Sequence, residues 1–148
     1  MSFTKHIEWK AITLAKLSEL ELSGYTAQAQ RNKDNYLSSG RSVLRAIAKH
    51  YGLVEHVVSV NRAGVAVSGD ITLIGMFSDM EHGIYIHMSE PRLFGMYTQP
   101  EFYYRSVSHI KDYTGGTNQT MTYEELASDL ELACDKMKSR VGAKREMV

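Results

Sequence analysis

Two segments with alternating side chains contain the residues best suited to bind an anion or to transfer a proton. In residues 83–89 and 102–110, every second side chain of a β-strand would lie on the same face. A guanidinium group binds a phosphate or carboxylate through two parallel hydrogen bonds, and a histidine exchanges protons near neutral pH. If the two strands pair in a suitable register, these polar side chains converge. The residues of this candidate ligand site are Tyr85, His87, Tyr103, Arg105 and His109.

This face also has a simpler interpretation, as a solvent-exposed side of a sheet that carries scattered polar residues. The apolar residues that alternate with them in 83–89 are expected to face the core. The cluster supports one functional hypothesis, a nucleotide- or phosphate-directed binding protein or enzyme that uses His87, Arg105 and His109. The sequence assigns no catalytic residue, which favours a protein that is not an enzyme.

Neither a metal ion nor a cofactor is expected from the motifs in the chain. The six histidines do not stand at a helical spacing of four residues, and no cysteine or carboxylate accompanies them in a ligand pattern. Residues 112–120 contain a glycine pair but lack the Lys-Ser/Thr ending of a phosphate-binding loop. The histidines are therefore interpreted as independent surface or core residues.

The glycine-rich segment 112–120 is a candidate for partner recognition. Its composition is too polar and too rich in glycine for a regular element, so it predicts an exposed turn or recognition loop. The leading hypothesis is a non-catalytic accessory or regulatory protein that binds another macromolecule, with a protein as the preferred partner. The partner-binding candidates in this loop are Asp112, Tyr113, Gly115, Gly116 and Asn118.

A third hypothesis is the binding of single-stranded nucleic acid. Arg41, Arg45 and Lys49 recur every four residues and share one side of a predicted helix. A Tyr-Tyr-Arg run at 103–105 could stack on bases and contact phosphates. However, the 17 basic residues balance the 17 acidic ones, so no overall field attracts a polyanion. Nucleic acid is therefore not the favoured partner.

The composition is that of an ordinary folded protein. The chain has 148 residues, of which 43% are hydrophobic and 23% charged, and it is expected to form one domain over 1–148 with a frayed tail at 142–148. The single cysteine, Cys134, excludes an intrachain disulfide and fits a reducing compartment. Without a continuous apolar run near the N-terminus, we expect a cytoplasmic protein with no membrane partner.

Helices are predicted before the central segment. The first is expected to start after Thr4 and to run to about Leu22, with apolar residues on more than one face. It is therefore either deeply buried or in contact with a partner, and a homodimer through this helix is one option. The second covers about 26–51, with a break considered at 38–40 and a stop at Gly52.

The middle third predicts consecutive antiparallel strands, because β-branched and aromatic residues alternate with short turn signals. Strands are expected at 54–60, at 64–76 with an interruption at 68–70, at 83–89 and at 102–110, with a short strand at 93–97. Gly64 is expected to take a positive φ in the first hairpin. A capping pair, Thr122 and Glu125, opens the last helix. This order predicts an α+β fold with two N-terminal helices, a central antiparallel sheet of about four or five strands and one C-terminal helix.

Overall fold

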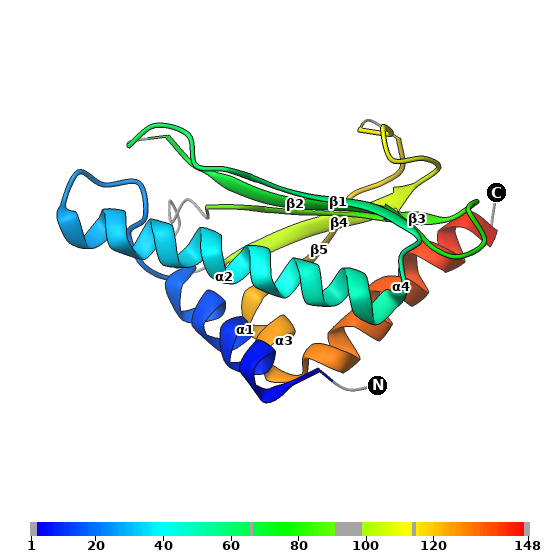
Figure 1. Ribbon diagram of the computed structural model, residues 1–148, viewed down its shortest axis with the longest axis horizontal. Coiled ribbons are helices and arrows are strands. Elements are labelled where there is room, and N and C mark those ends of the chain that lie inside the picture. The colour runs from blue at the N-terminus through cyan, green and yellow to red at the C-terminus, as the bar shows by residue number, and fades with distance from the viewer. Residues whose placement is uncertain (1–2, 66, 91–98, 114, 147–148) are drawn as a thin grey trace.

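The computed structural model describes residues 3–65, 67–90, 99–113 and 115–146, with side chains to 142. Two helices come first, then five strands, then two more helices (Figure 1). The elements are α1 (Lys5–Leu17), α2 (Ala27–Tyr51), β1 (Glu55–Asn61), β2 (Asp70–Met76), β3 (Gly83–Ser89), β4 (Glu101–Val107), β5 (Gln119–Thr122), α3 (Tyr123–Ser128) and α4 (Leu130–Glu146). The predicted α+β fold class is confirmed.

The five strands form an antiparallel meander in the order β1-β2-β3-β4-β5. All the described helices lie on one side of this sheet, and α2 runs along it beside β1 and β2 (Figure 1). Ile84, Ile86 and Met88 of β3 point to the helical side and are fully buried, as the alternation predicted. The opposite face is partly covered by the segment between β4 and β5, which rises above the sheet (Figure 1).

Helix α1 starts where the sequence predicts but ends earlier. The Thr4 hydroxyl accepts a hydrogen bond from the amide of Ile7 at 3.3 Å, as an N-cap does. The helix ends at Leu17, so the predicted end near Leu22 was wrong. At the next residue, the Ser18 hydroxyl donates to the backbone oxygen of Ala15 at 2.6 Å, and such local bonds compete with helix continuation.

Helix α2 is continuous, so the break considered at 38–40 does not occur. The Thr26 hydroxyl caps its first turn. Gly52 closes the helix with a φ of 64°, as predicted. Gly40 faces the sheet, where a Cβ atom would lie 2.7 Å from Cδ1 of Ile71. The glycine therefore marks close contact between helix and sheet, not an interruption of the helix.

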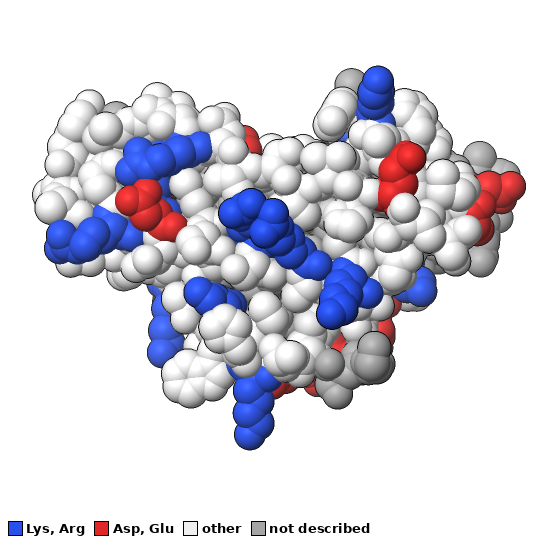
Figure 2. All heavy atoms as spheres, viewed as in Figure 1, with Lys and Arg blue, Asp and Glu red and all other residues white. Residues whose placement is uncertain are grey.

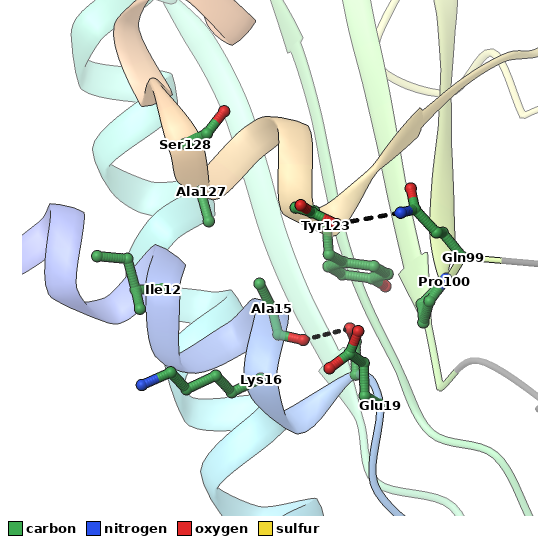
Figure 3. A pocket seen from close by; sticks show the side chains of 11 residues that line it. Ile12, Ala15, Lys16, Glu19, Gln99, Pro100, Tyr123, Ala127 and Ser128 are labelled. Carbon is green, nitrogen blue, oxygen red and sulfur yellow. Dashed lines mark hydrogen bonds between the residues drawn. The ribbon is translucent and has the colours of Figure 1, made fainter.

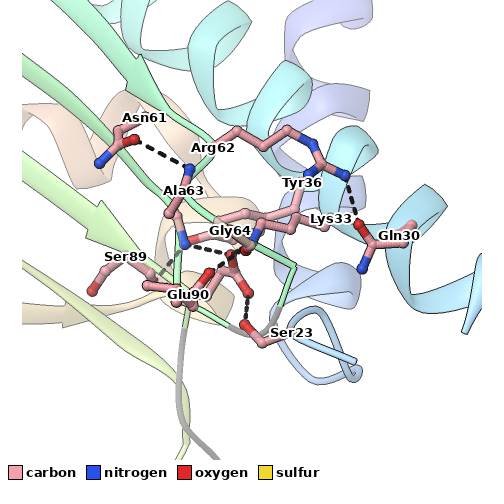
Figure 4. Close-up of polar contacts among 12 residues, drawn as sticks. Ser23, Gln30, Lys33, Tyr36, Asn61, Arg62, Ala63, Gly64, Ser89 and Glu90 are labelled. Carbon is pink, nitrogen blue, oxygen red and sulfur yellow. Dashed lines mark hydrogen bonds and ion pairs between the residues drawn. The ribbon is translucent and has the colours of Figure 1, made fainter. Parts of the chain in front are cut away.

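A buried ion pair connects α2 to the first hairpin, as Figure 4 shows. Lys33 is fully buried, and its Nζ atom lies 2.9 Å from the Gly64 oxygen, 2.7 Å from the Val67 oxygen and 3.1 Å from Oε2 of Glu90. An ammonium group has three donors, and all three have partners here. The cost of burying this charge is therefore offset by an ion pair and two hydrogen bonds.

The carboxylate of Glu90 extends the same network and explains where β2 begins. It accepts hydrogen bonds from the Ser23 hydroxyl and from the amide of Gly69. The network binds the backbone of Gly64, Val67 and Gly69, and no described residue of 64–69 joins the sheet. The strand predicted from residue 64 was therefore wrong at 64, 65 and 67, while the interruption expected at 68–70 ends one residue earlier, because β2 begins at Asp70.

The turn after β1 also differs from the prediction. The positive φ falls on Ala63, at 58°, and not on Gly64. The Asn61 side chain accepts a hydrogen bond from the Ala63 amide at 3.1 Å, and Asn side chains often direct turns in this way. The short strand predicted at 93–97 lies outside the described residues.

The C-terminal part contains one strand and one helix break that were not predicted. Residues 119–122 form β5 beside β4, although they were expected to lie mostly in a loop. The predicted last helix is divided at Asp129, whose extended backbone ends α3 and whose carboxylate accepts from the amide of Leu132 in the next helix. Helix α4 then continues past Gly142 to Glu146. The predicted core positions of these helices are buried, namely Leu126, Leu130, Ala133, Met137 and Val141.

Crossing a bilayer requires about 20 consecutive apolar residues in a helix. Within the described ranges, no helix has both that length and that composition.

Candidate functional site

The sheet face opposite the helices carries four of the five predicted ligand-site residues. Tyr85 pairs with Arg105 across β3 and β4, and His87 pairs with Tyr103, so these side chains lie on the same face. His109 lies beyond the end of β4, is exposed, and accepts a backbone hydrogen bond within its own turn. It is therefore not part of this hydrogen-bonded group, because β4 ends at Val107 and not at 110.

His87 is the centre of this polar group. Its Nδ1 atom lies 2.9 Å from the hydroxyls of both Tyr85 and Tyr103, and its ring stacks on Tyr103 with centroids 4.8 Å apart. On the other side, Nε2 lies 3.9 Å from Oδ2 of Asp70. Asp70 was not among the predicted site residues, although strand alternation in 70–76 would have placed it on this face. The geometry fits a neutral ring that carries its proton on Nε2 and accepts a tyrosine hydrogen bond at Nδ1.

Burial decides the protonation of His87. Desolvation lowers its pKa below the ordinary value of 6.5, and the charge of Asp70 opposes this shift without cancelling it. Burial also raises the pKa of Tyr85 to about 12, with a further contribution from Tyr103. Neither group is therefore charged at neutral pH, and the two side chains contribute hydrogen-bonding groups to this face but no charge.

We predict that NMR titration of the His87 ring gives a pKa below 6.5, and that Asp70→Asn lowers it further. The folded chain binds this proton less readily than the unfolded chain. The contribution of His87 to stability is therefore complete above pH 6.5 and decreases as the pH falls below that value. The variant His87→Asn should lose this part of the pH dependence. A ring pKa at or above 6.5, or an upward shift in Asp70→Asn, would contradict the prediction.

The guanidinium of Arg105 has structural partners. It is 4% exposed, donates to the backbone oxygens of Gly115 at 2.7 Å and Asp112 at 3.0 Å, and lies 4.7 Å from the ring centroid of Tyr85. These contacts hold the segment between β4 and β5 against the sheet. Both terminal nitrogens of Arg105 therefore donate hydrogen bonds to the loop backbone, which weakens the hypothesis that this residue binds a phosphate together with His87.

The Tyr-Tyr-Arg run at 103–105 does not present a joint surface to a nucleic acid. Neighbouring residues of a strand point to opposite faces. Tyr104 accordingly lies in the core with no exposed surface, and its hydroxyl accepts a hydrogen bond from Arg140 at 2.7 Å. Only the half-buried Tyr103 offers part of its ring to solvent on the other face.

Asp112 shapes the predicted recognition loop from inside. One carboxylate oxygen accepts from the amide and the hydroxyl of Ser108, at 3.0 and 3.2 Å, and the other accepts from the amide of Gly115 at 2.9 Å. Desolvation opposes ionisation of this carboxyl group, but these hydrogen bonds and the charge of Arg105 outweigh it and lower its pKa. Asp112 and Gly115 therefore order the loop and do not point to a partner.

The other candidates of this loop divide into one structural residue and two exposed ones. Gly116 has a φ of 80°, and a Cβ atom there would lie 2.8 Å from the backbone oxygen of Ser106. Tyr113 is 63% exposed and packs edge-on against Tyr85, and Asn118 is exposed. Tyr113 and Asn118 are thus exposed side chains of this loop that a partner can reach.

A second polar surface lies on the opposite side of the sheet, along α2. Arg41, Arg45 and Lys49 are all exposed, and none of them forms an ion pair with another described residue. Figure 2 shows basic side chains over the middle of α2, with acidic ones only toward the margins of this view. A groove of about 460 Å³, called the basic groove below, separates α2 from β1. Its lining residues are Leu37, Ser38, Arg41, Ser42, Arg45, Val58 and Val60.

The other wall of the basic groove is an edge strand. β1 pairs only with β2 in the described sheet, so its second edge is free. Val57 and Val60 are 46% and 41% exposed, and no lysine or proline interrupts the strand. Proteins commonly use such residues to protect a free edge from pairing. The three cations could be recognised from their spacing in the sequence, but this free edge could not, because local patterns do not give the order of strands in a sheet.

A smaller groove of about 320 Å³ lies on the other side of α2, between α1 and α2. It is lined by Trp9, which is 70% exposed, and it shares Ser38 with the basic groove. Helix α1 buries Ala11, Leu14 and Leu17 but leaves this tryptophan at the surface. The apolar excess of the first helix therefore has two explanations, since one side packs in the core and the other remains exposed.

A third groove, of about 570 Å³, lies between α1 and α3 (Figure 3). Ile12 and Ala15 line its α1 side, and Ala127 lines its α3 side. Its charges have both signs, with Lys16, Glu19 and Glu124 among the lining residues. Unlike the basic groove, it therefore carries charges of both signs.

The described residues contain no group of three or more His, Cys, Asp or Glu side chains that could hold a metal ion. Cys134 is buried, and desolvation raises the pKa of its thiol to about 12, so it is not a reactive thiolate. The chain is thus an α+β protein with an antiparallel meander, helices on one face and a basic groove beside a free edge strand. Comparison with protein-family models, curated proteins and solved structures found no match in any of the three.

Proposed function

We propose that this is a non-catalytic accessory or regulatory protein that binds another protein through the exposed side of α2. The observation that carries the proposal is the row of Arg41, Arg45 and Lys49, exposed and without ion-pair partners among the described residues. Trp9 is exposed on one side of this row, and the valines of β1 are exposed on the other. Arginine and tryptophan are enriched among the residues that dominate binding energy at protein interfaces.

The lining of the basic groove favours a protein over a nucleic acid. Nucleic-acid sites combine cations with aromatic rings on which bases stack. The basic groove is instead lined by Leu37, Val58 and Val60, which suit aliphatic side chains of a partner. The balanced net charge also supplies no long-range attraction to a polyanion. The proposal places the protein in the cytoplasm, where the single free thiol of Cys134 suits a reducing environment.

Site-specific photo-crosslinking in the source cells tests this proposal. A photoreactive amino acid is placed at Ser38 in the basic groove, at Tyr113 in the loop, or at the exposed Leu132 of α4 as a control. We expect Ser38 to yield a discrete protein adduct that disappears when Arg41→Glu and Arg45→Glu are introduced together. Leu132 should yield no such adduct. An adduct from Tyr113 would support the separate prediction that the loop contacts a partner.

Two results would overturn the proposal. An adduct at Ser38 that nuclease treatment removes would show that the surface binds nucleic acid. The same weak pattern of adducts from Ser38 and from Leu132 would show that the basic groove has no partner.

A further inference from the structure

The basic groove lies between a helix and the free edge of a sheet. Extended peptides bind other domains at such places by adding a strand to the sheet, with main-chain hydrogen bonds for affinity and side-chain pockets for specificity. Helix α2 contacts both β1 and β2 and runs beside β1 on the same side of the molecule (Figure 1). A segment that paired with β1 would therefore lie directly over the groove.

We propose that the partner supplies an extended acidic segment, which pairs with β1 as an additional strand and places its carboxylates against Arg41, Arg45 and Lys49. This inference rests on the proposed function and specifies how the partner binds. The side chains of the added strand would point alternately toward α2 and away from it. The side chains on the α2 side would lie beside Val58 and Val60, the residues of β1 that line the groove.

The spacing of the cations matches the spacing of a strand. Residues four apart on a helix rise by about 6 Å along its axis. Residues two apart on a strand are separated by about 6.6 Å. An acidic residue at every second position would therefore meet Arg41 and Arg45, which line the groove, and then Lys49 one turn further along α2. Each arginine can also bind a carboxylate through two hydrogen bonds.

Charge argues against a second copy of this chain as the added strand. No acidic residue lines the basic groove. If β1 paired with β1 of another copy, Arg41 and Arg45 of both copies would be brought together, and like charges at an interface are unfavourable. The groove therefore fits a different chain of opposite charge better than it fits a homodimer.

A fluorescent peptide in which glutamate alternates with valine provides the probe. We expect it to bind the full-length protein in a fluorescence anisotropy titration, and the same peptide with lysine for glutamate to show no binding. The double variant Arg41→Glu/Arg45→Glu should bind at least about tenfold more weakly, because two attractions become repulsions. The matched control Arg31→Glu/Lys111→Glu changes the net charge equally at exposed positions outside the groove and should keep wild-type affinity.

Methylation of the peptide backbone tests the strand pairing directly. An added strand bonds to β1 through the amides of every second residue, while the other amides face away. Because alternate glutamates must face α2, slipping the register by one residue cannot exchange the two sets. N-methylation of one alternate set should abolish binding, and N-methylation of the other should leave it nearly unchanged. Hydrogen exchange should show that the intact peptide protects the amides of β1.

The peptide experiments and the crosslinking experiment test the two proposals separately. If both methylated peptides bind like the parent peptide, or both fail, β1 is not the docking strand. The inference also fails if no glutamate peptide binds, or if the lysine peptide binds equally well. If a protein adduct at Ser38 is nevertheless found, the proposed function stands without this mode of binding. Failure of both experiments overturns both proposals.

Discussion

Lys33→Met is expected to lower the free energy of unfolding by about 3–5 kcal/mol, because removing one partner leaves a buried charge uncompensated. Glu90 would keep its bonds from Ser23 and Gly69 but lose the only cation paired with it among the described residues. The oxygens of Gly64 and Val67 would lose their donor at the same time. Urea unfolding, followed by circular dichroism, measures the loss.

An exposed ion pair supplies the matched control. Lys136 and Glu125 lie 3.3 Å apart with side chains nearly half exposed, so Lys136→Met should change stability by no more than about 0.5 kcal/mol. In the buried pair, Lys33→Met/Glu90→Leu should cost less than the sum of its two single variants, because the partners interact directly. A loss below about 1 kcal/mol in Lys33→Met would show that water reaches the pair.

Gly40→Leu is the second substitution with a large expected effect, a loss of about 2–3 kcal/mol from overpacking. Residue 40 is buried between α2 and β2, where a Cβ atom would meet Ile71 at 2.7 Å and Leu14 at 3.6 Å. A longer side chain must displace these residues or separate the helix from the sheet. Gly40→Ala should cost less, since its methyl group meets the end of a side chain that can move. Thermal and urea unfolding measure both variants.

Gly142 is a second glycine within a helix, but with open space around it. No atom lies within 4 Å of a Cβ built at this position. Gly142→Leu should therefore preserve stability or raise it by up to about 1 kcal/mol through helix propensity alone. If the two leucine variants behaved alike, close packing at Gly40 would not be the reason for its effect.

The sequence predicts the elements whose signals are local. The cap at Thr4, the cap at Thr122 and the glycine stop at Gly52 were predicted and appear in the structure. The alternation in β3 correctly predicts which face is buried. The prediction of the buried face is correct because a helix or strand next to a core repeats its apolar residues with its own period.

The failures concern features that depend on distant residues. A strand was predicted from residue 64, but Lys33 binds the backbone oxygens of Gly64 and Val67 instead. The short polar strand β5 shows no alternation of apolar and polar residues that could predict it. It forms by pairing with β4. Asp129 is an exception, because an aspartate before a helical segment is a local capping signal that could have been recognised.

Only part of the candidate site could be predicted from the sequence. Side chains that alternate on two predicted strands correctly predict that Tyr85, His87, Tyr103 and Arg105 share a face. Their hydrogen-bond partners could not be predicted, and these commit Arg105 to the loop. The cations of α2 were visible at their spacing of four, but the groove beside them depends on which strand lies at the edge of the sheet.

The meander has a consequence for the order in which the sheet can form. Each strand pairs only with strands adjacent to it in the chain, so every pairing closes a short loop. Such a sheet has a low contact order for a β-structure, and low contact order accompanies fast folding. The sheet can grow one hairpin at a time, and within the described sheet β1 pairs with β2 alone. An acidic segment that docked on β1 would be the next strand in the same succession, supplied by another chain.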